Sequence, residues 1–254
     1  MERIVTQRAA AICFVAMFCS STLASAGAYA ADATGWNYAA AIYGWVPNID
    51  IELQSGEKSK ITQDDIISNL DMSFQGVFRV GRGPWSFSTD IIYFDLSNDD
   101  HSDRQQVLNL RKITLQESLV TPNVGYRFLD AGESWTEVYV GARYAWIKAT
   151  LKFQQNPPLE SRSFNKSDKL DHWDGVVGLR GQYTFAGNWF VPYEADVGTG
   201  QSDFVTNLLA GVGYRFGNLD AVAAYRYLHY DFGDNWALKT ETPSGPLIGV
   251  VFRF

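Results

Sequence analysis

The chain has 254 residues, of which 46% are hydrophobic, 15% aromatic and 19% charged. This apolar and aromatic content excludes a collagen-like, coiled-coil or broadly disordered chain. The formal net charge of −7 argues against a nucleic-acid partner, which would select a basic surface.

The N-terminus has the pattern of a secretory signal peptide. Arg3 and Arg8 precede a short apolar run over residues 9–18, and small residues follow it. A membrane-spanning helix needs ~20 apolar residues, so this run is too short for an anchor. We therefore predict export through the secretory pathway.

Small residues also suggest where this segment ends. Cleavage is expected after Ala26 or Ala30, so that residues 1–30 are removed and residues 31–254 form a single domain. Both cysteines lie in the removed part. The mature chain then has no thiol for a disulfide, for catalysis or for metal binding.

From Trp36 onward, apolar residues alternate with polar or small ones, which is the period of a β-strand with two different faces. Val138 and Val140, for example, alternate with Glu137 and Tyr139. Turn residues divide the chain into about ten strands, most of them long enough to cross a bilayer. We place these strands near 36–47, 71–80, 85–97, 109–128, 135–153, 170–185, 189–198, 203–216, 219–232 and 245–254.

The connections between these strands alternate in length. Short connections are expected at 81–84, 129–134, 186–188 and 217–218. Longer polar ones are expected at 48–70, 98–108, 154–169 and 233–244, with 199–202 as a short exception. Tight turns at one end and long loops at the other predict an all-β fold, a closed antiparallel up-and-down transmembrane β-barrel of about ten strands, with eight or twelve as alternatives.

The first long connection contains a possible short helix. Thr62 and Asp65 have the spacing of an N-cap and a first-turn acid, and Ile66, Ile67 and Leu70 would share one helical face. We expect either a short helix that folds over the barrel mouth or lies on the membrane, or a single helical turn in a solvent loop.

Aromatic residues recur where strands meet the short turns. Amphipathic rings favour the membrane–water interface, so their repetition at one level predicts an interfacial girdle. The predicted girdle comprises Trp36, Trp85, Trp189, Tyr126, Phe128, Tyr183, Phe185, Tyr214 and Phe216. Trp135 falls on the opposite face from Val138, which suggests a bulge or a misplaced strand start.

The signal peptide, the Tyr-Arg-Phe strand ends and the terminal segment 249–254 resemble those of Gram-negative outer-membrane β-barrel proteins. This resemblance implies a location in the cell outer membrane, in contact with its lipid and lipopolysaccharide. It also implies that Phe252 and Phe254 are read by the barrel-assembly machinery. It covers nearly the whole mature chain as architecture and identifies no particular functional family.

The face opposite the apolar one carries charges of both signs. Isolated buried charges are very costly, so charges inside a narrow barrel must pair. A ten-stranded barrel is only slightly wider than an eight-stranded one filled by its side chains. The predicted lumen charge network comprises Arg79, Asp90, Arg127, Glu137, Arg143, Asp174, Arg180, Glu194, Asp196, Arg215, Arg226 and Arg253.

These features favour an integral outer-membrane barrel with a largely occluded lumen. Two roles are open: a structural network that holds the barrel together, or a narrow, porin-like conduit for small ions or solutes. A third alternative is a surface binding or adhesion module that uses the loops 154–169 and 233–244.

The histidines raise an enzymatic alternative, a hydrolase acting on outer-membrane lipid or lipopolysaccharide. His101, His172 and His229 all fall toward the long connections, and Ser102 and Asp103 are adjacent to the first. Neighbours in a polar loop rarely reach triad geometry, and the spacing matches no metal-ligand pattern. We therefore expect no enzyme, no catalytic residue, no cofactor and no metal.

Overall fold

The protein is described from a computed structural model. It describes residues 35–99, 108–155, 163–233 and 238–254. The predicted signal peptide and its cleavage site lie outside these residues and stay predictions. Within the described ranges, no helix is long and apolar enough to cross a membrane.

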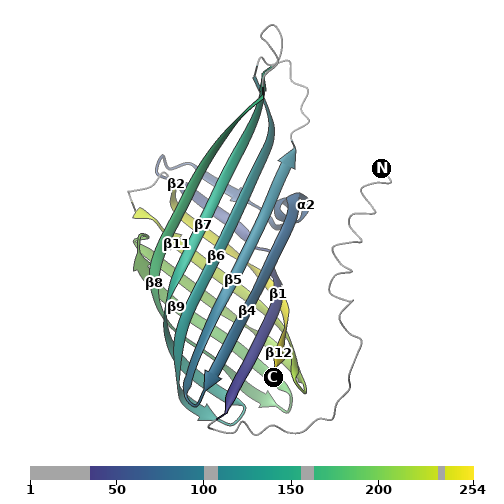
Figure 1. Ribbon diagram of the computed structural model, residues 1–254, viewed down its shortest axis with the longest axis vertical. Helices are drawn as coiled ribbons and strands as arrows, with labels where there is room; N and C mark the ends of the chain where they lie inside the picture. The colour runs from purple at the N-terminus through teal and green to yellow at the C-terminus, as the bar shows by residue number, and fades with distance from the viewer. Residues whose placement is uncertain (1–34, 100–107, 156–162, 234–237) are drawn as a thin grey trace, which may run out of the picture. The chain divides into compact units, whose positions relative to one another are not determined.

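The described part of the chain forms a closed antiparallel barrel in which ten strands pair in sequence order (Figure 1). The first and last strands close it, with registers from Ala39 opposite Arg253 to Trp45 opposite Leu247. The barrel strands are β1 (Trp36–Trp45), β4 (Leu70–Arg82), β5 (Trp85–Asp99), β6 (Leu108–Ala131), β7 (Ser134–Gln155), β8 (Ser163–Ala186), β9 (Trp189–Gly200), β10 (Phe204–Phe216), β11 (Leu219–Asp231) and β12 (Leu238–Arg253). The predicted fold and strand number are confirmed.

Four two-residue turns join strand pairs at one end of the barrel. Each begins with a glycine of positive φ: Gly83 (58°), Gly132 (71°), Gly187 (60°) and Gly217 (66°). A two-residue hairpin turn needs positive φ at its first position, where glycine has no Cβ to clash. The sequence therefore sets these hairpins locally.

The first long connection differs from the predicted loop over 48–70. It contains β2 (Asn48–Leu53), β3 (Lys58–Ile61) and α2 (Gln63–Asn69). β2 extends the sheet along the upper part of β12, from Asn48 opposite Ser244, and β3 pairs with β2. β2 therefore takes the place of β1 beside β12 toward the long connections, and β3 extends the sheet from β2.

Several strands are longer than predicted, and β6, β7 and β8 are the longest of them. β6, β7 and β8 have 24, 22 and 24 residues and rise past their neighbours at the long-connection end (Figure 1). The predicted loops 154–169 and 233–244 are correspondingly too long, because strand pairing includes Gln154 opposite Ser163 and β12 begins at Leu238. The parts of these loops that remain between strands lie outside the described residues.

The two faces of the strands differ in exposure as their alternation predicts. On β7, Val138 and Val140 are exposed, whereas Glu137 and Tyr139 are buried. The outward face is apolar and the inward face carries both polar groups and an apolar cluster. The inward cluster comprises Trp45, Ile92, Phe94, Leu119, Tyr139, Ala145, Val176, Val205, Leu228, Tyr230, Phe232 and Leu247.

Candidate functional site

The charged groups that point into the barrel form layers, and one layer on the short-turn side centres on a single acid. Glu137 is fully buried and accepts hydrogen bonds from the guanidinium groups of Arg79 (3.0 Å, Nη1 to Oε1) and Arg180. The Ser86 hydroxyl donates to both of its oxygens at 3.2 Å. Gly125 leaves room for this acid, because a Cβ there would lie 2.7 Å from Oε1 of Glu137. Two cations from strands far apart in sequence therefore converge on one carboxylate.

A second layer crosses the barrel from one wall to the other, and we call it the transverse network. Its members come from β1, β5, β7, β9, β10 and β11. They are Tyr43, Asp90, Tyr139, Arg143, Glu194, Asp196, Asn207 and Arg226.

On one side of this network, Arg226 joins an acid to an amide. Its Nη1 donates to Oδ2 of Asp90 at 2.8 Å, and its Nε donates to Oδ1 of Asn207 at 2.9 Å. The hydroxyl of Tyr43 donates to the other oxygen of Asp90 at 2.5 Å. Asn207 continues this series of hydrogen bonds, since its Nδ2 donates to Glu194 at 2.9 Å.

On the other side, Arg143 and Asp196 form a bidentate pair with N–O distances of 3.0 and 2.8 Å. Their side chains are 1% and 0% exposed. Tyr139 and Asn207 donate to the same carboxylate at 2.7 and 3.0 Å. A charge-assisted bidentate pair with its remaining lone pairs satisfied is among the stronger arrangements that buried charges adopt.

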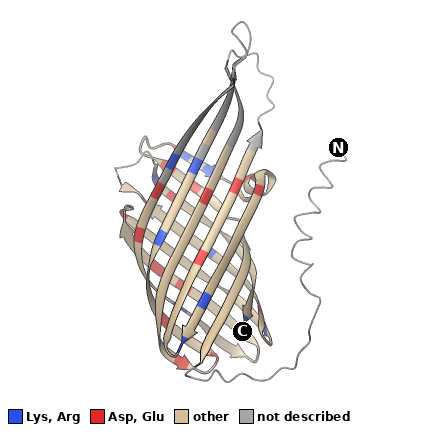
Figure 2. Cartoon of the chain, in the orientation of Figure 1, with Lys and Arg blue, Asp and Glu red and all other residues tan. Residues whose placement is uncertain are grey.

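Other predicted members of the charge network pair closer to the turns. Arg215 and Arg253 both pair with Asp220, and Arg215 also reaches Glu133 at 3.2 Å. Arg127 pairs with Asp130, three residues further along β6. Figure 2 shows basic and acidic residues at the ends of the barrel and at intervals along its strands.

Asp174 lies apart from both layers. It accepts the backbone N–H of Ser202 at 2.8 Å, and its other oxygen lies 3.7 Å from Nε2 of His172. His172 is buried against the rings of Tyr230 and Phe232. Its two ring nitrogens and the Ser202 hydroxyl have no hydrogen-bond partner among the described residues, so no Ser–His–Asp relay is formed there.

The remaining histidines give no such relay in the described part either. The Nδ1 atom of His229 lies 2.8 Å from the hydroxyl of Thr242. His101, Ser102 and Asp103 lie outside the described residues. No group of three or more His, Cys, Asp or Glu side chains in the described ranges could hold a metal ion.

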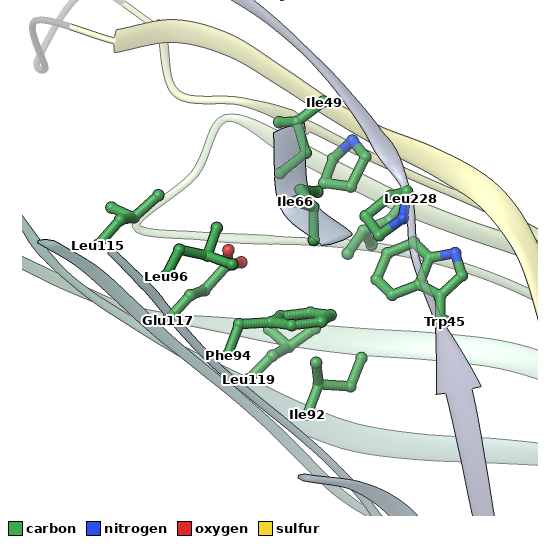
Figure 3. A pocket seen from close by; sticks show the side chains of 12 residues that line it. Trp45, Ile49, Ile66, Ile92, Phe94, Leu96, Leu115, Glu117, Leu119 and Leu228 are labelled. Carbon is green, nitrogen blue, oxygen red and sulfur yellow. The ribbon is translucent and has the colours of Figure 1, made fainter. Parts of the chain in front are cut away.

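Beyond the transverse network, toward the long connections, lies an apolar space that we call the chamber (Figure 3). Glu117 contributes the one ionisable side chain of its lining. The other lining side chains include Trp45, Ile66, Ile92, Phe94, Leu119 and Leu228. The Trp45 ring lies 5.2 Å from the guanidinium carbon of Arg226, so the two regions are in contact.

Helix α2 closes the chamber with a single side chain. Ile66 is 2% exposed, whereas Ile67, its neighbour on the helix, is 62% exposed. The prediction of a helix is confirmed, but the expected shared face is wrong, because consecutive residues on a helix point about 100° apart. With Ile66 in place, the free cavity volume is about 10 Å³, room for one water molecule at most.

The first turn of α2 is fixed by its cap. The Thr62 hydroxyl and the Asp65 carboxylate satisfy each other's backbone N–H groups, which is a capping box. Hydrogen bonds from the Thr62 hydroxyl and backbone N–H hold the pKa of Asp65 below its usual range. The N–H of Gln63 donates to the side chain of Asn48 at 3.1 Å, which ties the helix to β2.

The predicted girdle aromatics lie on the outward face near the short turns. Two contacts link neighbouring strands there, Trp85 with Tyr126 (5.0 Å between centroids) and Trp189 with Tyr214 (4.9 Å). Trp135 instead faces inward, under the guanidinium groups of Arg79 and Arg127. The more exposed members are Trp36, Trp85, Trp189, Tyr126, Phe128, Tyr183, Phe185 and Phe216.

The sequence reasoning missed several members of these layers. Asp220 is the shared partner of two predicted arginines, and Asn207 and Tyr43 bridge predicted ions. Each lies on the inward period of its strand, so strand alternation was a usable signal for Asp220 and Asn207. Glu117, also on that period of β6, was missed as well.

Comparison with known proteins gives a family and several similar folds. A family model described as "Outer membrane protein beta-barrel domain" matches residues 16–216. Ail, the attachment invasion locus protein of Yersinia pestis, is 10% identical over 87% of this chain and 99% of its own, with a TM-score of 0.37. Neisserial surface protein A is 14% identical over 87% and 99%, with a TM-score of 0.34. The transport unit of the autotransporter AIDA-I from Escherichia coli is 10% identical over 97% of each chain, with a TM-score of 0.38. Among curated proteins, none matches.

Proposed function

The chain belongs to the outer membrane protein β-barrel family, whose model matches most of its length, and on that premise we propose that it is a closed, structural barrel. It is an outer-membrane protein of the Gram-negative type. In our proposal its lumen is occluded by paired charges, and it performs no enzymatic chemistry. Outer-membrane lipid and lipopolysaccharide surround its apolar outer face.

One observation carries this proposal: the arginines of the transverse network and the carboxylate of Asp196 have almost no exposure to solvent. Arg143 and Asp196 are 1% and 0% exposed on their side chains, and Arg226 is 3% exposed. A hydrated ion would have to separate these pairs, and an unpaired buried charge costs several kcal/mol. The Glu137 cluster beneath is less closed, because the side chains of Arg79 and Arg180 are 16% and 11% exposed.

The C-terminal strand supports the proposed assembly route. Phe252 and Phe254 are 46% and 69% exposed on the outward face of the barrel. Phe254 stacks against Tyr38 of β1 at 6.0 Å, beside the strand pair that closes the barrel. Both rings are thus accessible to the barrel-assembly machinery that we propose as a partner.

Planar-bilayer recording tests the closure. We expect the refolded wild-type protein to give no discrete conductance, and the double variant R143A/D196A to give discrete openings, because it removes the central pair. The matched control is K60A/D50A, which removes an exposed pair on β2 and β3 and is expected to stay silent. Heat-modifiable gel migration checks that each variant folds as a barrel.

A discrete wild-type conductance would contradict closure. It would favour the second candidate, a narrow channel for small ions or solutes, for which the observation is that inward-facing charges of both signs follow one another along the barrel. If R143A/D196A folds as a barrel by gel migration but gives no conductance, the transverse network is not what closes the lumen.

A further inference from the structure

Two carboxylates near the chamber differ from the acids in the layers below, because no side chain of the described residues donates a hydrogen bond to them. Glu117 lines the chamber, and its carboxylate points into it between Leu96 and Phe94 (Figure 3). Glu241, on β12, is 7% exposed. Glu241 lies two residues from Pro243 of the chamber lining, on the same buried face of β12, and its carboxyl group repels that of Glu117 when both are ionised.

Neither carboxylate has a hydrogen bond or an ion pair with another side chain of the described residues. Arg143 is close enough to Tyr230 to interact with it electrostatically, but its guanidinium group forms its ion pair with Asp196 and not with these two acids. Buried charges are normally paired or bind a ligand, because an isolated one pays a large desolvation cost. Two carboxyl groups without a side-chain partner beside an apolar chamber are therefore available to an external cation.

A third group at the same place is also unpartnered. Tyr230 is 4% exposed, and its hydroxyl is buried with no hydrogen-bond partner in the described part of the chain. It lies directly opposite Glu241 on the neighbouring strand and two residues from Leu228 of the chamber lining, on the same buried face of β11. Buried hydroxyls are hydrogen-bonded in the large majority of proteins, so this one points independently to an occupant.

The other side chains that line the chamber determine which chemical class of ligand it can bind. Its other walls are hydrocarbon or aromatic, with Trp45, Phe94, Leu119 and Leu228 among them. These side chains favour a ligand with an apolar body, and the Trp45 and Phe94 rings can also form cation–π interactions with a positively charged group. A metal ion would find too few ligands, since the described residues contain no metal-binding group of three.

We propose that the chamber binds a small amphiphilic amine, a molecule with one protonated amino group on an apolar body. The ammonium group lies between Glu117 and Glu241 and within reach of the Tyr230 hydroxyl. The apolar body takes the place of the Ile66 side chain, so binding requires α2 to move outward. The occupied site opens toward the long connections, with the transverse network as its floor.

This inference goes beyond the proposed closure and fails separately from it. A barrel that conducts ions can still bind an amine above the network, and a silent barrel can fail to bind one. Bilayer currents therefore test the first proposal, and equilibrium binding tests the second.

The experiment uses benzylammonium as the probe, with benzyl alcohol as its neutral counterpart, on the full refolded protein in detergent micelles. Calorimetry and tryptophan fluorescence report binding, and titration of protein-free micelles corrects for partition. We expect saturable binding of benzylammonium, at least tenfold tighter than that of benzyl alcohol. Equal affinity for both molecules, or binding of neither, would overturn the proposal.

Two variants locate the site. E117Q is expected to weaken benzylammonium roughly 10- to 100-fold, as the loss of a charge-assisted hydrogen bond does, and to leave benzyl alcohol unchanged. The matched control E57Q alters an exposed glutamate in the turn between β2 and β3 and should change neither affinity. Unchanged benzylammonium affinity in E117Q would overturn the assignment.

Ile66→Ala provides a measurement that does not depend on the folding of E117Q. Removing the plugging side chain should tighten both probes, because neither then has to displace it. Ile67→Ala, on the exposed side of the same helix, should leave both affinities as in the wild type. Equal affinities in I66A and the wild type would contradict binding beneath α2.

Discussion

In the transverse network the carboxylates of Asp90 and Asp196 each meet a guanidinium and a tyrosine hydroxyl, whereas those of Glu117 and Glu241 at the adjoining chamber meet neither. The two regions touch through Trp45 and Arg226 and share strands β1, β5 and β11. Partners thus make the difference, since each set has one buried acid, Asp196 or Glu241, and one half-buried acid, Asp90 or Glu117. The acids of the network have their partners within the folded protein, whereas in our proposal those of the chamber obtain one only from a bound amine.

The largest expected effect comes from removing the acid beneath the network. E137A leaves Arg79 and Arg180 facing each other without a counter-charge, and breaking a buried pair in this way typically costs about 3–5 kcal/mol. Denaturant unfolding in liposomes measures the change. The control E133A removes an exposed glutamate four residues earlier and is expected to cost about 1 kcal/mol or less. Equal losses in the two variants would contradict the layered pairing.

A smaller effect is expected at the roof of the chamber. T62A removes half of the capping box, and loss of an N-cap costs about 1 kcal/mol, here confined to α2. Hydrogen exchange over residues 63–69 should become faster, and benzylammonium should bind more tightly because Ile66 leaves more easily. An unchanged rate of hydrogen exchange over residues 63–69 in T62A would show that the cap does not hold Ile66 in the chamber.

The same helix gives a pH dependence whose sign follows from Asp65. Hydrogen bonds from Thr62 lower the pKa of Asp65 in the folded protein. Its contribution to α2 is therefore present above the unfolded pKa, near ~3.9, and is lost as the pH falls through the lower folded value. Exchange over α2 in the wild type should approach that of T62A at acid pH.

Much of the barrel could be predicted from the sequence because its rules are local. Glycine at the first turn position fixes each tight hairpin, and strict alternation assigns the faces of β7 and β8. The β2–β3 hairpin was missed although it had a usable signal. Ile49, Ile51 and Leu53 alternate with polar residues, and the acids of β2 face lysines of β3.

The site was less predictable, because pairing depends on which strands meet across the barrel. Alternation places Glu137 and Arg79 on the inward face but does not bring together residues 58 positions apart. Nor does it reveal that Glu117 has no partner, which depends on the positions of all its neighbours. Grouping Ile66 with Ile67 was an error in applying helical periodicity, which separates consecutive residues by about 100°. The docking of α2 then shows which of the two side chains enters the chamber.

The comparison between the two regions is tested most directly by two isosteric changes measured side by side. D196N and E117Q each replace one carboxylate by an amide, and denaturant unfolding in the same liposomes gives both free energies. We predict that D196N destabilises the barrel by about 2 kcal/mol, since it weakens charge-assisted hydrogen bonds from Arg143. We predict that E117Q leaves stability unchanged or raises it, because it removes an unpaired buried charge. Similar destabilisation by both would contradict the account.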